Sequence, residues 1–272
     1  DNSKPHELGK NEGVIYTMMN VGWLMGPLIS ASLAERYGFS LVFLLSAFFF
    51  FLALGSYKFL NIGAKKRIAV SSSVNFFRYV KEFLMNKDML KNYIVSGAPS
   101  VWWSFIFVYV PLYIIESGLD LQWVAYFLFA VIIPVLSLEY YFSILAEKVR
   151  YRKIFITGNI ILASVLFLAF FVNNIYMLLF LFVLGSVGIA MVESSTEAYF
   201  FLVVPQRSIE KYYSIYNTTI DVFAILGKLI IAGILALLSF KFSFLFIALL
   251  FLLFAWVSMH MREISGREKI KY

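Results

Sequence analysis

Long apolar segments separated by short polar turns make up most of the sequence. An α-helix rises about 1.5 Å per residue, so roughly 20 apolar residues are needed to cross the hydrocarbon core of a bilayer. Eight segments are close to this length or longer, at residues 13–34, 39–60, 92–116, 121–146, 154–172, 175–204, 212–238 and 244–261. The pattern therefore predicts an all-α polytopic membrane protein with eight transmembrane helices.

The longest polar stretch, residues 61–91, separates the second predicted span from the third. Between Ser73 and Met89 its apolar residues recur at helical spacing, with charged residues between them: Arg78, Lys81 and Glu82. This pattern predicts an amphipathic helix that either lies on the membrane surface or is a solvated linker helix. The chain then divides into two spans (1–60), a cytoplasmic linker (61–91), a six-helix half (92–261) and a cytoplasmic tail (262–272).

The distribution of Lys and Arg residues predicts the orientation. If both ends of the chain are cytoplasmic, 20 of the 23 cations fall in cytoplasmic segments, Arg36 and Lys241 lie in outer turns, and Lys228 lies within a span. Positive charge in short loops favours the cytoplasmic side of a membrane. We therefore expect a multi-pass protein of the cytoplasmic (inner) membrane with both ends on the cytoplasmic side.

Composition restricts the chemistry that the chain can perform. The residues are 61% hydrophobic and 14% charged, and the net charge of +7 is spread over the turns, which argues against nucleic-acid binding. There is no cysteine, and the two histidines, His6 and His260, lie near opposite ends. We therefore predict no metal site, no cofactor, no catalytic residues and no enzyme activity. A membrane-embedded enzyme acting on a lipid or glycan, and a structural or channel-like protein, are the alternatives.

Five charged residues lie well inside predicted spans, away from the span ends: Glu139, Glu193, Glu197, Asp221 and Lys228. Each would cost about 3 kcal/mol if it faced lipid, so we expect all five to line an interior. Glu193 and Glu197 are one helical turn apart and repel each other, which makes them the leading candidates for binding a proton or substrate. The alternative is a structural ion-pair network that includes Lys228.

The third span carries a stripe of aromatic residues. At about 100° per residue, Trp102, Tyr109 and Tyr113 fall on one helix face. They are candidate cavity aromatics for an organic substrate, although packing or an interfacial aromatic belt is the alternative.

Small residues in the first span follow a specific spacing. Gly13, Gly22 and Gly26-Pro27 are followed by Ser30-Ala31, and such small residues allow two helices to approach closely. The spacing resembles the fifth-helix motif of the major facilitator superfamily, g-x8-G-x3-G-P-x2-G-G, with Ser30-Ala31 in place of the last glycine pair.

A second resemblance lies in the basic turn after the fourth span. The segment from Ser143 to Lys153 is similar to the cytoplasmic loop G-x-L-a-D-r-x-G-r-r of the same superfamily. Ser143 and Arg150 stand where glycines are usual. The positions that fit are Leu145, Ala146, Glu147, Lys148, Arg152 and Lys153.

The register of the two motifs implies that the chain is a fragment corresponding to family helices five to twelve. The resemblance implies a secondary active transporter that moves a small organic solute by alternating access. The first motif is associated in the superfamily with exporters, particularly proton-coupled antiporters. The implied partners are the lipid bilayer, the solute and protons, and we expect a monomer.

Overall fold

The computed structural model describes residues 8–59 and 76–264, and within these residues every regular element is a helix. The chain divides into two compact units. The smaller is Val21–Phe76, and the larger consists of residues 1–20 together with 77–272. Seven helical segments are long and apolar enough to cross a membrane: Phe39–Phe59, Lys87–Glu116, Gln122–Val149, Tyr151–Phe171, Ile175–Val203, Gln206–Leu237 and Phe240–Met259. They confirm seven of the predicted spans. Helix α1 (Leu8–Tyr37), which contains the other, is not among them, so the eighth span stays a prediction.

The smaller unit contains the end of α1 and helix α2 (Phe39–Phe59). The two helices meet at Gly38, whose φ of +80° is easily adopted only by a residue without a Cβ. No residue of α2 is buried, and its run of phenylalanines, Phe48 to Phe51, is exposed. An apolar helix exposed on all sides suits a lipid environment.

The third span of the sequence is broken in the larger unit. It consists of α4 (Lys87–Val95), α5 (Ala98–Ser104), the π-helix η2 (Phe105–Tyr109) and α6 (Val110–Glu116). The wide turn is closed by a hydrogen bond from the Val110 N–H to the Phe105 carbonyl, five residues back. Pro111 follows directly, and the wider turn relieves the clash that a proline ring makes with the preceding helical turn.

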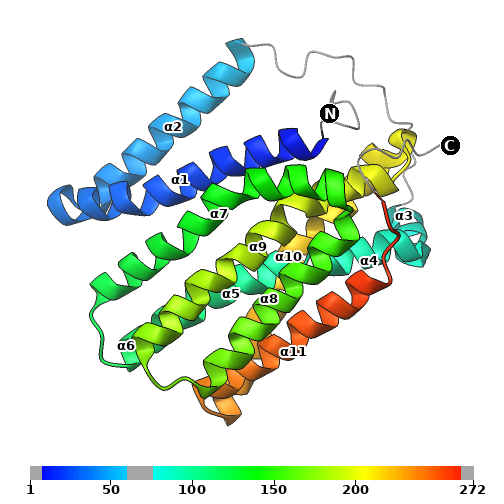
Figure 1. Cartoon of the computed structure of the whole chain (residues 1–272). Coiled ribbons are helices and arrows are strands. Elements are labelled where there is room, and N and C mark those ends of the chain that lie inside the picture. Colours follow the sequence, from blue (N-terminus) through cyan, green and yellow to red (C-terminus); the bar gives the residue numbers. More distant parts are fainter. Residues whose placement is uncertain (1–7, 60–75, 265–272) are drawn as a thin grey trace. The chain divides into compact units, whose positions relative to one another are not determined.

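The rest of the larger unit is a bundle of long helices (Figure 1). Helix α8 (Tyr151–Phe171) packs against both α9 (Ile175–Val203) and α11 (Phe240–Met259), and α7 (Leu121–Val149) packs against α9. A short 3-10 turn, η3 (Gln206–Ser208), leads into α10 (Ile209–Leu237), which packs along α5. The Asn174 side chain caps α9 by accepting the backbone N–H groups of Tyr176 and Met177 at 2.9 and 3.1 Å.

Glycines bring α8 and α9 into close contact in the core of this bundle. A Cβ at Gly188 would lie 2.7 Å from the Gly158 carbonyl oxygen, and a Cβ at Gly158 would lie 2.7 Å from the Gly188 carbonyl oxygen. Gly185, one turn before Gly188, leaves room for the fully buried ring of Trp102 from α5. The α8–α9 crossing therefore depends on the absence of side chains at these positions.

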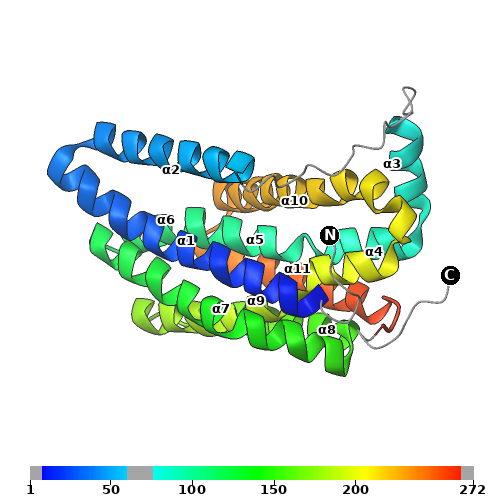
Figure 2. The same cartoon turned by 90° about the horizontal axis from the view of Figure 1, so that it is seen from above.

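Helix α3 (Phe76–Met85) crosses the end of the bundle, at an angle to α4 and α10 (Figure 2). Its buried Phe83 packs against Tyr93 of α4 and Tyr212 of α10. The predicted amphipathic helix is therefore present where the structure describes it, from residue 76 onward. Its apolar face packs against other helices of the protein. The sequence-based interpretations had placed the helix on the membrane surface or in solvent.

Candidate functional site

The two glutamates of α9 are held by aromatic donors from two other spans. The Trp103 indole N–H lies 3.0 and 3.2 Å from the two carboxylate oxygens of Glu193. The Tyr213 hydroxyl of α10 donates to Glu197. Both carboxylates are half-buried. Helices α5, α9 and α10 therefore all contribute a side chain to this cluster.

Tyr213 is positioned by stacking and by the turn between α9 and α10. Its ring lies parallel to that of Phe201, with centroids 5.8 Å apart and an interplanar angle of 12°. Glu197 and Tyr213 stand eight residues before and eight residues after Pro205, so an antiparallel helical hairpin places them opposite each other. This symmetry is visible in the sequence and could have identified Tyr213 as the partner of Glu197.

Helix α10 is joined to the broken span by hydrogen bonds along its length. The Thr219 hydroxyl donates to the Tyr93 carbonyl at 2.8 Å. The Ser104 hydroxyl donates to the Ala224 carbonyl at 3.2 Å, and the Tyr109 hydroxyl donates to the Lys228 carbonyl at 2.6 Å. Each contact satisfies polar groups that would be costly in a membrane interior.

The other charged candidates lie apart from the carboxylate pair. Asp221 and Lys228 have exposed side chains on α10, whereas Glu139 of α7 is fully buried. Within the described part of the chain, the recorded ion pairs are Arg78–Glu82, Lys211–Glu82 and Arg150–Glu263. Lys228 takes part in none of them, so the ion-pair network considered from the sequence is not seen around this residue.

The three residues of the predicted aromatic stripe have different contacts. Trp102 is fully buried and packs against Phe251 of α11, Tyr109 reaches α10, and Tyr113 packs against Phe240 and Phe244 of α11. The π-helix η2 begins after Trp102 and ends at Tyr109, and its wide turn breaks the α-helical spacing from which the stripe was predicted. The sequence pattern gave no sign that Trp103 is the residue that faces Glu193.

Comparison with known families identifies the fold. The family model described as Major Facilitator Superfamily matches residues 1–140 and 129–270. The chain belongs to the major facilitator superfamily. No curated protein gives a significant match. Together with the seven candidate spans, this membership makes the chain a multi-pass membrane protein of a transporter family, and the resemblance seen in the sequence is confirmed.

The cytoplasmic loop motif, residues 143–153, contains the joint between α7 and α8, which is a single residue outside both helices. That residue, Arg150, has a φ of +106°, and it is the only non-glycine residue with positive φ in the described ranges. The conformation explains why a glycine is usual there. Arg150 pairs with Glu263 at 2.7 Å, and the next residue, Tyr151, donates its N–H to the Ile264 carbonyl at 3.3 Å. The joint is therefore tied to the segment after α11.

Replacing Arg150 by glycine should stabilise the protein. A strained backbone conformation costs about 1–3 kcal/mol, and the exposed ion pair that would be lost contributes little. We expect the thermal unfolding midpoint in detergent to rise for Arg150→Gly and to fall slightly for Glu263→Gln, which removes the charge and leaves the strain. An Arg150→Gly midpoint below that of the unmodified protein would show that the ion pair outweighs the strain.

The helix-packing motif of α1 has no described partner. A Cβ at Gly22 or Gly26 would have no heavy atom within 4 Å, and the side-chain surroundings of Gly13 and Pro27 lie outside the described residues. The close helix contact predicted from this motif stays a prediction.

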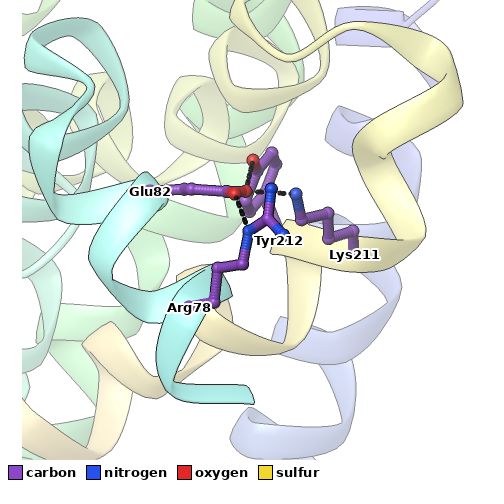
Figure 3. Close-up of polar contacts among 4 residues, drawn as sticks. All are labelled: Arg78, Glu82, Lys211 and Tyr212. Carbon is purple, nitrogen blue, oxygen red and sulfur yellow. Dashed lines mark hydrogen bonds and ion pairs between the residues drawn. The ribbon is translucent and has the colours of Figure 1, made fainter. Parts of the chain in front are cut away.

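A second polar cluster, centred on Glu82, attaches α3 to the start of α10 (Figure 3). Arg78 donates to one carboxylate oxygen of Glu82 at 2.8 Å. Lys211 and Tyr212 both donate to the other, the tyrosine at 3.1 Å. Hydrogen bonds from Lys211 and then Arg78 lower the pKa of Glu82 from 4.5 to about 2. The ionised carboxylate is therefore the form that holds α3 in place.

The attachment of α3 should persist in moderately acidic solution. Because the pKa of Glu82 is lowered, its contribution is complete above about pH 4.5 and is lost as the pH falls through about 2. Spin labels at Phe77→Cys and Glu210→Cys, both exposed positions, should keep a fixed separation at pH 4 and separate near pH 2.

Glu82→Gln should release the helix already at pH 7, whereas Glu263→Gln, the same change in another exposed carboxylate, should not. A label separation that is unchanged in Glu82→Gln would contradict this role of the carboxylate.

Proposed function

We propose that the chain forms the carrier part of a secondary active transporter, which moves a small organic solute across the cytoplasmic membrane by alternating access. Membership of the major facilitator superfamily supports a transporter. The observation that carries the proposal is the carboxylate pair of α9, where Glu193 and Glu197 receive hydrogen bonds from two other spans. A polar centre shared by three spans is the arrangement expected of a pathway through a bundle.

The exposed polar face of α10 extends this pathway. Asn217, Asp221 and Lys228 are exposed in the described structure and lie in a helix long enough to cross a membrane. Contact with lipid would cost about 3 kcal/mol for each charged side chain. We therefore assign this face to a water-filled route that passes the Glu193–Glu197 pair.

Proton coupling is assigned to the carboxylate pair. Two acids one turn apart in a partly dehydrated bundle can share a proton, and each accepts a hydrogen bond from an uncharged aromatic donor. Binding the proton from one side and releasing it on the other would couple solute movement to the proton gradient. We also propose that α1 crosses the membrane as an eighth span. Both ends of the chain would then lie on the cytoplasmic side.

Flux measured in proteoliposomes of the full-length protein tests this function. A carrier gives saturable flux that depends on a gradient. A membrane-embedded enzyme gives turnover of a lipid or glycan without flux, and a channel gives flux that does not saturate. Either of the last two results would overturn the proposal.

A further inference from the structure

Helix α3 lies where three spans end. Its buried Phe83 belongs to a small apolar cluster with Phe200 and Val204 from the end of α9 and Tyr216 from the first turns of α10. Met85, the last residue of α3, is two residues before Lys87, where the next candidate span begins. The helix crosses the bundle end instead of continuing along it (Figure 2). Because membrane spans end near the lipid headgroups, a helix at this position is suited to contact the membrane surface.

The face of α3 that points away from the bundle is both apolar and basic. Phe77, Leu84 and Met85 are 83%, 47% and 72% exposed. At about 100° per residue, Lys81 lies between them on the same face, and its side chain is exposed. We call these four residues the outer face of α3. Three large apolar side chains beside a cation form an unfavourable surface for water and a suitable one for a membrane interface.

The acidic residue of α3 does not contribute to this face. Glu82 is the one acid in the helix, and it is bonded to Lys211 of α10. The outer face therefore has no negative charge of its own. Lys87, which follows directly at the start of α4, is exposed and adds a second cation at the same end of the bundle.

From these observations we infer that the outer face of α3 binds the anionic phospholipid surface of the bilayer, with Lys81 and Lys87 at the headgroups and the apolar residues in the interface. Each Lys or Arg near an anionic bilayer raises the ratio of lipid-bound to water-exposed helix roughly fivefold. Two cations would therefore make lipid contact depend strongly on headgroup charge. The apolar residues alone would give contact with any lipid.

A spin label on the outer face tests this inference directly, because the chain contains no cysteine that would label in the background. The chain with Met85→Cys is labelled and placed in nanodiscs of phosphatidylcholine, with or without phosphatidylglycerol. Collision with oxygen reports contact with lipid, and collision with a nickel chelate reports contact with water.

Adding phosphatidylglycerol should move the Met85 label from water to lipid, and high salt should reverse the change. Lys81→Gln with Lys87→Gln should lower the ratio of lipid-bound to water-exposed label roughly 25-fold. A label at Ser117, an exposed position in the turn between α6 and α7, should not respond to these substitutions.

Two results would overturn the inference. A label that stays in water in both lipid mixtures would make α3 a solvated linker helix. A label that is shielded from both reagents in both mixtures would mean that protein, such as a second copy of the chain, covers the outer face.

Discussion

Replacing either glutamate of α9 by glutamine should abolish proton-driven transport. Glutamine has nearly the same shape, and its carbonyl oxygen can still accept the hydrogen bond from Trp103 at position 193 or from Tyr213 at position 197. It cannot bind or release a proton. We therefore expect pH-driven uptake into proteoliposomes to fall at least tenfold, to background, while the protein remains folded and inserted.

The control is Glu210→Gln, because Glu210 is an exposed acid in the first turn of α10, away from the pair. It should transport at the unmodified rate. Trp103→Phe keeps an aromatic ring but removes the donor to Glu193, so it should shift the pH at which uptake is half-maximal instead of abolishing uptake. If Glu193→Gln and Glu197→Gln both transport normally under a proton gradient, the pair is not the coupling site.

Gly188→Ala should be strongly destabilising. The new Cβ would lie 2.7 Å from the Gly158 carbonyl oxygen and 3.0 Å from the Leu162 side chain, so α8 and α9 would have to separate. Overpacking of this kind costs about 1–3 kcal/mol. Thermal unfolding in detergent should show a clear fall in the midpoint, and Gly158→Ala should act in the same direction.

Gly233 of α10 provides the matched control. An added Cβ at this position has no heavy atom within 4 Å, and alanine favours a helix over glycine. Gly233→Ala should therefore be neutral or slightly stabilising. Equal midpoints for Gly188→Ala and Gly233→Ala would contradict the close α8–α9 crossing.

Hydropathy predicted the spans well because a long apolar segment in a membrane satisfies its backbone groups by forming a helix. The seven confirmed helices begin and end within six residues of the predicted bounds, since backbone groups in lipid must be bonded within the helix itself. The role of Gly38 as the end of α1 was also predictable, because its positive φ follows from the turn between two helices.

The candidate site was predictable in part. The spacing of Glu193 and Glu197 placed both on one helix face, but their partners depend on how α5 and α10 pack, which helical spacing alone does not contain. The π-helix changed the helical register from Phe105 onward, so the spacing that placed Tyr109 and Tyr113 on the face of Trp102 did not hold. Likewise, the apolar spacing of α3 predicted a helix and could not tell protein from lipid as its contact.

Sided labelling of α10 tests the pathway most directly. Asn217 is exposed on the same helix as Asp221 and Lys228, and in the full-length protein Asn217→Cys would be the one reactive thiol of this chain. We expect a membrane-impermeant thiol reagent to reach it from one side of the membrane, and from the other side when the proton gradient is reversed. Phe246→Cys, on the exposed apolar face of α11, should react from neither side. An Asn217→Cys variant that is unreactive from both sides would place this face of α10 in lipid and contradict a transport pathway beside the Glu193–Glu197 pair.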